Sequence, residues 1–284
     1  MQASNNKNED KKTSSRIKAF PVPFPLGAIE KNIIINTKLS KEQVNHKLYN
    51  QKFYNRQIDG SLKSAKEYIK YLSDLFNFKS VIDFGCGRGT WLKGFEEIGV
   101  DKLVGLDGSW NNQENMLSQK IIFKQTNLNE EIKIDEKFDL ALSLEVAEHL
   151  EPSSSELFIK SITSSSDLIM FGAAFIAQPG TNHINTRLHS FWANIFAEYS
   201  FKVYDIFRPK FCGNNKIKPW YQQNTFLYVK AGSKYEKALH EKNFCPIENI
   251  SFLDLIHPWL YGHYLNQYIA IQKEINNKLQ PPAK

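Results

Sequence analysis

The sequence predicts an α/β fold of the doubly wound, Rossmann-like kind, and three observations lead to it. Residues 81–84 form an apolar run that contains Asp83, and three glycines alternate with other residues directly after it. A second apolar run ends at Asp107, about 20 residues beyond the glycine turn. Further apolar runs of strand length alternate with segments of helical spacing. Strand, glycine turn, helix, strand and acid make one half of a nucleotide-binding sheet.

The spacing of the glycines bears on which nucleotide the turn accepts. Glycine lets the backbone pass close to a ligand with no side chain in the way. Dinucleotide sites usually read G-x-G-x-x-G, whereas Gly85, Gly87 and Gly89 bring the third glycine one residue early. An NAD enzyme would also need a nicotinamide pocket and a hydride partner, and the sequence identifies neither. NAD binding is therefore the weaker alternative.

The acid-x-Gly-x-Gly-x-Gly pattern of residues 83–89 resembles the first motif of class I S-adenosylmethionine (SAM) methyltransferases. The similarity continues in order through residues 80–92, 105–110, 138–140, 143–150 and 220–224. These segments resemble one group of that family, common in bacterial gene clusters for capsule and other surface glycans, over roughly residues 54–230. The resemblance implies SAM as methyl donor, S-adenosylhomocysteine (SAH) as product, and a seven-stranded class I sheet that ends in an antiparallel pair.

The apolar runs define the elements that we expect in this sheet. Strands are expected near residues 80–84, 102–106, 120–124, 138–144, 167–173, 201–208 and 224–230. Helices should follow the first, second, fourth and fifth of these strands. Two helices should precede the sheet, a short one at residues 41–54 and a firmer one at residues 61–76.

Composition divides the chain into three parts. Residues 1–45 are rich in polar residues at their start and carry prolines further on, which predicts a disordered tail and an extended arm. Residues 46–232 form the methyltransferase domain. Residues 233–284 form a C-terminal appendage whose apolar residues recur at helical spacing. This helical appendage should pack either on the domain or on a second subunit, which would make the protein a homodimer.

Charge and cysteine content limit the classes of partner and the cellular compartment that we expect. A net charge of +6 spread over scattered lysines, without basic runs interleaved with aromatic residues, gives no reason to expect a nucleic-acid partner. Cys86, Cys212 and Cys245 have no paired spacing, which suits a reducing cytoplasm. The sequence shows neither a signal-peptide pattern nor an apolar stretch long enough for a bilayer. A lipid-linked acceptor would therefore be met from the cytoplasmic side.

The resemblance assigns the methionine end of SAM to the glycine turn. Gly85, Cys86 and Gly87 should line that end, and Asp83 should shape the turn. In the family a helix before the first strand caps the SAM site, which makes Tyr54, Ser61 and Ser64 candidate contacts. The alternative for these three residues is that they only cap and pack the helix.

The adenosine end should meet residues that follow the second, third and fourth strands. Asp107 should accept hydrogen bonds from both ribose hydroxyls, because one carboxylate offers two acceptor oxygens. Gly108 should let the backbone approach the adenine. Asn127, where many relatives carry an acid, should accept the adenine amino group through its amide carbonyl, together with the backbone amide of Leu128. Glu145 is a further candidate contact to SAM.

Two histidine-bearing clusters are candidates for the chemistry of methyl transfer. The first is Glu145, Glu148 and His149, which would share one helical face if a helix begins there. The second contains His183 and follows the fifth strand. Relatives tend to read His-x-Asn-Glu-Gln here, whereas residues 183–187 of this chain keep the His and Asn and replace the Glu-Gln pair by Thr and Arg. The arginine suits a carboxylate or phosphate on the acceptor.

Three roles compete for these clusters. In the first, His183 or His149 is the general base, since an imidazole with a pKa of roughly 6.5 suits that task. In the second, Glu145, Glu148, His149 and His183 hold Mg²⁺ or Mn²⁺, because Glu-x-x-Glu-His resembles the metal motif of ubiquinone-pathway and small-RNA methyltransferases. In the third, the Glu-His pair only caps and packs.

Late aromatic and polar residues can form the wall of an acceptor site or the core of the last hairpin. These residues are Arg208, Trp220, Tyr221, Gln222 and Asn224. The other histidines of this half, His189, His257 and His263, are expected to be surface or packing residues.

The sequence is interpreted as an O-methyltransferase that acts on a glycan precursor. The resemblance suggests a hydroxyl on a nucleotide-linked or lipid-linked sugar of a surface polysaccharide, or a phosphoramidate-type decoration of one. Two alternatives stay open. One is an O-methyltransferase for a small metabolite or quinone precursor, and the other is a non-catalytic SAM-binding subunit of a partner enzyme.

Overall fold

The computed structural model describes the backbone of residues 51–279 and the side chains of residues 60–275. The predicted tail and arm at residues 1–45, and most of the predicted helix at residues 41–54, lie outside the described residues. Among the described residues, no helix is both long enough and apolar enough to cross a membrane.

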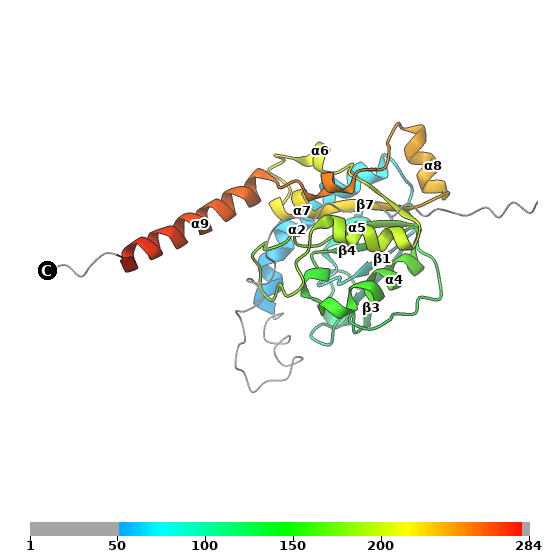
Figure 1. Ribbon diagram of the computed structural model, residues 1–284. Helices are drawn as coiled ribbons and strands as arrows, with labels where there is room; N and C mark the ends of the chain where they lie inside the picture. The colour runs from blue at the N-terminus through cyan, green and yellow to red at the C-terminus, as the bar shows by residue number, and fades with distance from the viewer. Residues whose placement is uncertain (1–50, 280–284) are drawn as a thin grey trace, which may run out of the picture. The chain divides into compact units, whose positions relative to one another are not determined.

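A seven-stranded sheet forms the centre of the fold, with the order β3-β2-β1-β4-β5-β7-β6 (Figure 1). The strands are β1 Ser80–Phe84, β2 Lys102–Asp107, β3 Ile121–Gln125, β4 Leu140–Leu144, β5 Leu168–Gly172, β6 Phe201–Tyr204 and β7 Thr225–Lys230. The first five pair in parallel, and β7 runs antiparallel between β5 and β6. The predicted seven-stranded sheet with a final antiparallel pair is confirmed.

The central strands are mostly apolar because helices cover both faces of the sheet. All five residues of β4 and all five of β5 are buried, as expected for parallel strands covered on both sides. One core cluster joins the sheet to α2 Gln51–Ser73 and α3 Thr90–Glu97. A second core cluster joins it to α4 Ser155–Ser165 and α5 His189–Glu198. Figure 1 shows α4 and α5 side by side over the sheet.

The helix expected after the second strand is not there. The connection from β2 to β3 holds only a 3₁₀ turn, η2 Gln113–Asn115. Its first residue bonds the edge strand directly, since Gln113 donates to the Ile121 carbonyl over 2.8 Å and accepts from the Phe123 amide over 2.9 Å. These bonds keep the connection flat along the edge strand, and so the prediction of an α-helix here is wrong.

The two predicted N-terminal helices are one helix within the described part of the chain. Helix α2 runs from Gln51 to Ser73 without a break at Gly60. A glycine inside a helix costs only about 1 kcal/mol. Burial of Ala65, Tyr68 and Leu72 against the sheet offsets that cost.

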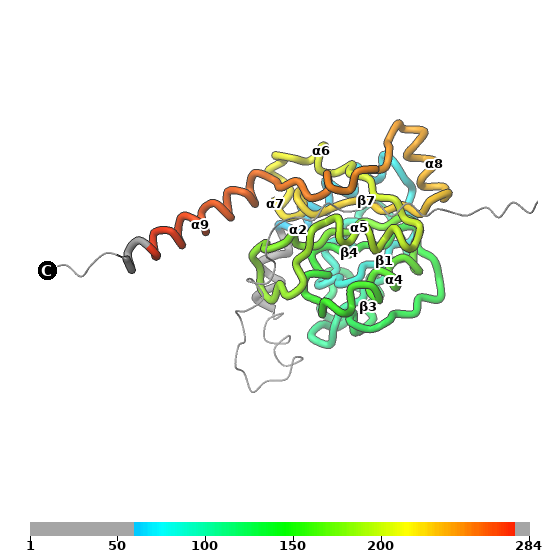
Figure 2. Tube along the Cα trace, viewed as in Figure 1, coloured from blue at the N-terminus to red at the C-terminus, as the bar shows by residue number. Residues whose placement is uncertain are grey.

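The C-terminal part consists of short helices bonded to the domain, followed by one long helix. Its elements are α6 Arg208–Phe211, α7 Pro219–Asn224, α8 Lys234–Glu241, η5 Ile250–Asp254 and α9 Pro258–Leu279. Arg208 donates to the carbonyls of Leu253 and Phe252, each over 2.8 Å, and Ser190 donates to Asp254. The segment between α8 and α9, which Figure 2 traces in orange, is therefore fixed to the α5 side of the sheet.

The aromatic cluster around Phe171 should be a main source of stability. Phe171 lies on β5, is 2% exposed and has the rings of Trp192, Phe196 and Tyr228 within 6.0 Å of its own. We expect Phe171→Ala to lower the free energy of unfolding by about 3–5 kcal/mol, because it leaves a cavity. Urea denaturation followed by circular dichroism measures this change.

The matched control for Phe171 is a substitution on the edge strand. Ile122 on β3 is 52% exposed, so Ile122→Thr should change the free energy of unfolding by no more than about 0.5 kcal/mol. Equal losses for the two variants would contradict the assignment of the Phe171 cluster to the core.

Candidate active site

A cavity of about 490 Å³ opens at the carboxyl ends of the parallel strands. Ligands of open α/β sheets bind at this edge, where the loops leave the strands. The wall comes from the loops after β1, β2, β3, β4 and β5, together with α2, α7 and α9. The lining residues include Ser61, Asp83, Gly85, Cys86, Gly87, Asp107, Trp110, Asn127, Leu128, Glu145, Glu148, His149, His183, Trp220, Tyr221, Trp259 and His263.

The glycine turn after β1 has a backbone that only glycine adopts easily. Gly85, Gly87 and Gly89 have φ angles of 87°, 52° and 74°, in the left-handed region that other residues avoid. A Cβ atom on Gly85 would lie 2.4 Å from Val146. The amides of Gly85 and Cys86 both donate to the Leu106 carbonyl, over 2.8 and 3.0 Å. The turn is therefore fixed to β2 and lies closely against the loop after β4.

Asp107 ends β2 and hydrogen bonds to the glycine turn. Its two carboxylate oxygens accept hydrogen bonds from the amides of Gly87 and Gly108, each over 2.7 Å. Burial raises the pKa of Asp107 to about 6, although these hydrogen bonds oppose the shift. Asp83 is also buried, and burial together with the charge of Asp107 raises its pKa to about 8. At neutral pH Asp107 therefore carries the negative charge and Asp83 is mostly protonated.

Trp110 lines the cavity, although the sequence did not single it out as a candidate site residue. A Cβ atom on Gly108 would lie 2.2 Å from the Trp110 ring, so the space that Gly108 leaves is filled by this indole. The side chains of Trp110 and Asn111 also hydrogen bond to Asp107. A glycine followed two residues later by an aromatic residue is the sequence signal that could have identified this contact.

The three candidate SAM contacts on α2 differ in their positions. Ser61 lines the cavity and hydrogen bonds to the Tyr221 hydroxyl over 3.1 Å. Ser64 is fully buried and does not line it, because its hydroxyl bonds the Gly60 carbonyl and the Lys218 amide. Its predicted contact to SAM is corrected to a packing role. Tyr54 lies on α2, but its side chain is outside the described residues.

Asn127 and Leu128 both reach the cavity wall. The Asn127 carbonyl oxygen accepts from the Asn129 amide over 3.1 Å, and its amide donates to Glu130 over 2.7 Å. The side chain is therefore held in a local turn. A carbonyl oxygen has two lone pairs, so one remains for a ligand donor.

Glu145 follows β4 directly and sits in a polar network. Its backbone has a φ of 58°, a conformation that costs energy for a residue other than glycine. Its carboxylate accepts from Asn224 over 2.8 Å and from Gln178 over 3.4 Å. Burial raises the pKa of Glu145 to about 7. The network joins the end of β4 to the loop after β5 and to α7.

The predicted helix that would place Glu145, Glu148 and His149 on one face does not form. Glu145 is held outside it, because its amide donates to the Gly172 carbonyl over 2.8 Å. Only Ala147–His149 forms a 3₁₀ turn, η3. The three side chains nevertheless line the same cavity, because the loop itself lies across the end of β4.

Glu148 is fully buried at the base of this cavity. Within the described residues neither of its carboxylate oxygens has a hydrogen bond of normal geometry. Burial and the neighbouring Glu145 raise the pKa of Glu148 well above its ordinary value. A buried carboxyl group without partners is costly, and a proton shared with Glu145 or a bound cation would relieve that cost.

His149 and His183 meet beside Glu148. Their rings are 4.9 Å apart, and one nitrogen of each lies within 4.8 Å of the other and of a Glu148 oxygen. The Nδ1 atoms face the carbonyls of Asn182 and Gln178, over 3.1 and 3.0 Å. Each Nδ1 therefore donates its hydrogen, and the neutral ring carries its lone pair on Nε2. Glu145 is not part of this three-residue group, which corrects the predicted set of four ligands.

Burial keeps the two imidazoles neutral. It lowers the pKa of His149 to about 4, with a smaller contribution from His183, and it lowers the pKa of His183 below its ordinary value. A neutral imidazole can accept a proton or bind a cation. The two neutral imidazoles therefore suit both of the chemical roles predicted from the sequence.

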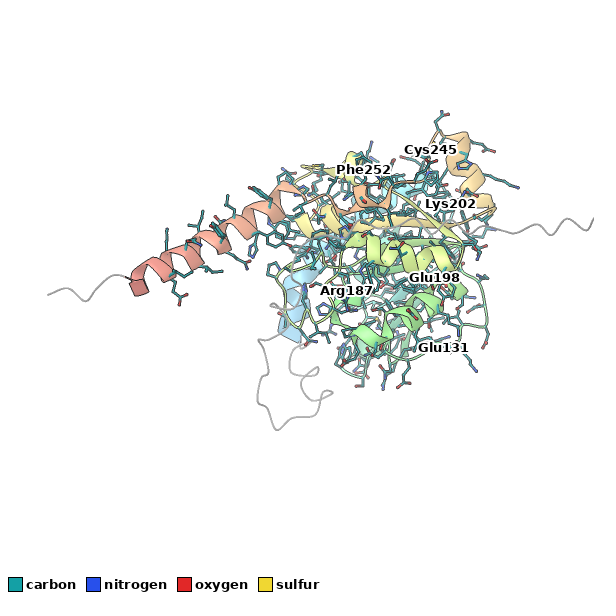
Figure 3. All side chains as sticks on the ribbon, viewed as in Figure 1. Glu131, Arg187, Glu198, Lys202, Cys245 and Phe252 are labelled. Carbon is teal, nitrogen blue, oxygen red and sulfur yellow. The ribbon has the colours of Figure 1, made fainter. Side chains whose placement is uncertain are left out.

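Thr186 and Arg187, which replace the Glu-Gln pair of the relatives, do not line the cavity. Asn185 is buried and donates to the Ala147 carbonyl and to Ser155, while Arg187 donates to Asn185 over 2.8 Å. Arg187, labelled in Figure 3, also lies over the Phe191 ring at 5.1 Å. It is absent from the cavity wall. The predicted influence of this arginine on acceptor choice is therefore not supported, and its contacts hold the loop to α5.

The distal wall contains two of the five late residues that the sequence suggested. Trp220 and Tyr221 line the cavity. Arg208, Gln222 and Asn224 are absent from the wall, because each is bonded elsewhere within the protein. His263 lines the wall together with Trp259, a position that the sequence did not predict. Their spacing of four residues on α9 is the only local signal for this pair.

Residues 54–194 match a family model described as a methyltransferase domain. No curated protein matches the chain.

Similar solved structures share low sequence identity with this chain. The methyltransferase domain of bacterial CtHen1-C is 17% identical, covers 59% of this chain and 97% of its own, and has a TM-score of 0.45. Magnesium protoporphyrin IX methyltransferase from Synechocystis PCC 6803 is 16% identical, with 69% and 100% covered and a TM-score of 0.48. CalS10, an amino pentose methyltransferase from Micromonospora echinaspora, is 9% identical, with 62% and 96% covered and a TM-score of 0.49. The sheet order, the glycine turn and the family match together show that the chain carries a class I SAM-dependent methyltransferase domain.

Proposed function

We propose that the cavity binds SAM and that the protein transfers its methyl group to an acceptor hydroxyl. The observation that carries this proposal is the position of Asp107, whose carboxylate lies beside the glycine turn in the same cavity as the His149–His183–Glu148 group. Asp107 would accept the ribose hydroxyls in place of the Trp110 and Asn111 side chains that now hydrogen bond to it. Gly85, Cys86 and Gly87 would line the methionine end, and Asn127 and Leu128 would meet the adenine.

The residues around the two histidines would handle the acceptor. SAM supplies the methyl group on a sulfonium, so that the acceptor oxygen forms the new bond to carbon while the sulfur keeps the electron pair and leaves as SAH. The protein has to align the acceptor oxygen and to take its proton. A neutral His183 or His149 can accept that proton at Nε2. We favour His183, because it is the less buried of the two rings.

A divalent cation is the alternative role for the same group. The buried, unpartnered carboxylate of Glu148 and two imidazoles held through Nδ1 fit a site for Mg²⁺ or Mn²⁺, since a ligating histidine usually donates its other nitrogen to a carbonyl. A cation held by Glu148, His149 and His183 would lower the pKa of a bound acceptor hydroxyl. The two roles are separable by experiment.

For the acceptor we propose a sugar hydroxyl of a surface-polysaccharide precursor. The resemblance to the glycan-cluster group and the faces of Trp220 and Tyr221 in the cavity wall support this class. A small metabolite or quinone precursor is the alternative acceptor, and a SAM-binding subunit without its own catalysis is the alternative function. We infer a cytoplasmic location from the free thiols of Cys86, Cys212 and Cys245.

Loss of the Asp107 carboxylate should weaken SAM binding. We expect Asp107→Ala to raise the dissociation constant of SAM at least about tenfold, because each hydrogen bond to a charged group contributes roughly 1.5–3 kcal/mol. Isothermal titration calorimetry measures the constant, and thermal melting shows whether the variant is folded. Asp101 is exposed and outside the cavity, so Asp101→Ala is the matched control and should bind as the wild type does.

The affinity for SAM should also depend on pH through Asp107. Burial raises the pKa of this carboxyl to about 6. The charged form, which accepts both hydroxyls, is therefore present above that pH and is lost as the pH falls through it. SAM should bind more weakly at pH 5 than at pH 7.5, and Asp107→Asn should remove most of this dependence. An unchanged wild-type constant across this range would count against the assignment.

The His149–His183 pair should be needed for transfer but not for SAM binding. With methyl-labelled SAM and a panel of sugar nucleotides, we expect His183→Ala to lower kcat about 10²–10⁴-fold, as loss of a general base does, with the SAM dissociation constant nearly unchanged. His240→Ala is the control, since His240 is exposed on α8 and outside the cavity wall.

Chelation distinguishes the base from the cation. If the histidines act as a base, EDTA leaves the rate unchanged and no metal is recovered by mass spectrometry. If they hold a cation, EDTA abolishes transfer and added Mn²⁺ or Mg²⁺ restores it. Label transfer to no acceptor, combined with normal SAM binding, would favour the non-catalytic subunit.

The exposed part of α9 suits contact with a second copy of the chain. Tyr261, Tyr268, Ile271 and Ile275 are each at least 44% exposed and, with Tyr264, recur at alternating spacings of three and four, the seam spacing of a two-helix coiled coil. We expect a dimer by light scattering and a monomer for the double variant Tyr268→Glu with Ile271→Glu. A wild-type monomer at micromolar concentration would exclude this contact.

A further inference from the structure

The first turns of α9 complete the far wall of the cavity. Trp259 and His263 lie one helical turn apart, and both line the cavity. Their rings are loosely stacked, with centroids 6.5 Å apart and planes 28° from parallel. This part of the wall lies beyond the family match, which ends at residue 194.

The start of α9 is held firmly in this position. The Gln223 side chain holds the segment that precedes α9. The amide of Gln223 donates to the Leu255 carbonyl over 3.1 Å, and the side-chain oxygen of Gln223 accepts from the His257 amide. Leu260 is fully buried. The Tyr264 hydroxyl donates to the Ile176 carbonyl over 2.6 Å, on the loop that leads to His183. The helix start is therefore fixed to the same loop as the histidine pair.

His263 has a buried nitrogen with no partner. Its Nε2 atom is shielded from solvent and, among the described residues, has no hydrogen-bond partner. A buried polar atom of this kind is costly unless a partner arrives. Trp259 beside it is 37% exposed. An indole face next to an unsatisfied imidazole nitrogen suits a ligand with an apolar face and hydroxyls at its edge.

A sugar ring has this combination of surfaces. Its axial C–H groups form an apolar face that packs on an aromatic ring, and its hydroxyls both donate and accept hydrogen bonds. A quinone ring offers the flat face but only carbonyl acceptors, and so it would serve only one tautomer of His263.

We propose that Trp259 and His263 form an acceptor subsite, in which the Trp259 ring covers one face of the acceptor sugar and His263 hydrogen bonds one of its hydroxyls. The inference rests on the proposed methyl transfer to a sugar hydroxyl. It gives α9 a role in specificity, separate from the residues that would bind SAM. Both residues act on acceptor binding and neither takes part in the chemical step.

The test compares variants of α9 in the labelled-SAM assay with a panel of UDP- and dTDP-hexoses. We expect Trp259→Ala and His263→Ala each to raise KM for the acceptor about tenfold, the equivalent of one hydrogen bond or ring contact. The SAM dissociation constant should stay within about twofold of the wild type. Asn266 is exposed on the same helix and lies outside both the cavity wall and the apolar residues proposed for self-association, so Asn266→Ala is the matched control.

The outcomes separate this inference from the proposed function. An unchanged acceptor KM in both variants, with wild-type transfer intact, overturns the subsite and leaves methyl transfer standing. A wild type that transfers label to a quinone or other non-sugar acceptor, but to none of the hexoses, overturns the sugar assignment. A wild type that does not bind SAM fails the proposed function itself. Loss of SAM binding in the variants would show that α9 supports the fold instead, which also overturns the subsite.

Discussion

The carboxylate of Asp107 accepting two backbone amides is the interaction on which the front half of the site depends. It joins the end of β2 to the glycine turn that leaves β1, and both loops then present their backbone to one cavity. The turn alone has an unfavourable left-handed backbone at three positions. Glycine adopts that backbone at little cost in free energy. The hydrogen bonds from the Gly87 and Gly108 amides to Asp107 then fix the two loops relative to each other.

The back half of the site is organised by buried polar groups. Glu145, Asn224 and Gln178 bond one another across three elements, while Glu148 offers oxygens that the described residues leave unsatisfied. The backbone carbonyl of Glu148 accepts the amides of Ile184 and Asn185, each over 2.9 Å. This bond pair brings the loop that carries His183 against His149. The groups with unsatisfied atoms therefore gather where an acceptor and its proton would be handled.

The C-terminal segment adds residues to the cavity wall, and hydrogen bonds hold this segment to the domain. Arg208 and His189 both bond the Leu253 carbonyl, and Gln223 fixes the start of α9. The same helix also presents exposed apolar residues for a second copy of the chain. Acceptor recognition and self-association would then use different residues of one helix, and Trp259 and His263 belong to the cavity.

Local chemistry determined the sheet and the cofactor end of the site. Apolar runs predicted all seven strands, and the glycine turn with Asp107 located the cavity, because strand periodicity and glycine conformation are properties of neighbouring residues. The missing helix after β2, the packing role of Ser64 and the structural role of Arg187 depended on partners elsewhere in the chain. So did the position of Trp259 and His263 in the wall of the cavity that His183 also lines. Contacts between residues so far apart in sequence follow from how buried surfaces pack, which no local pattern records; only the tertiary structure decided them.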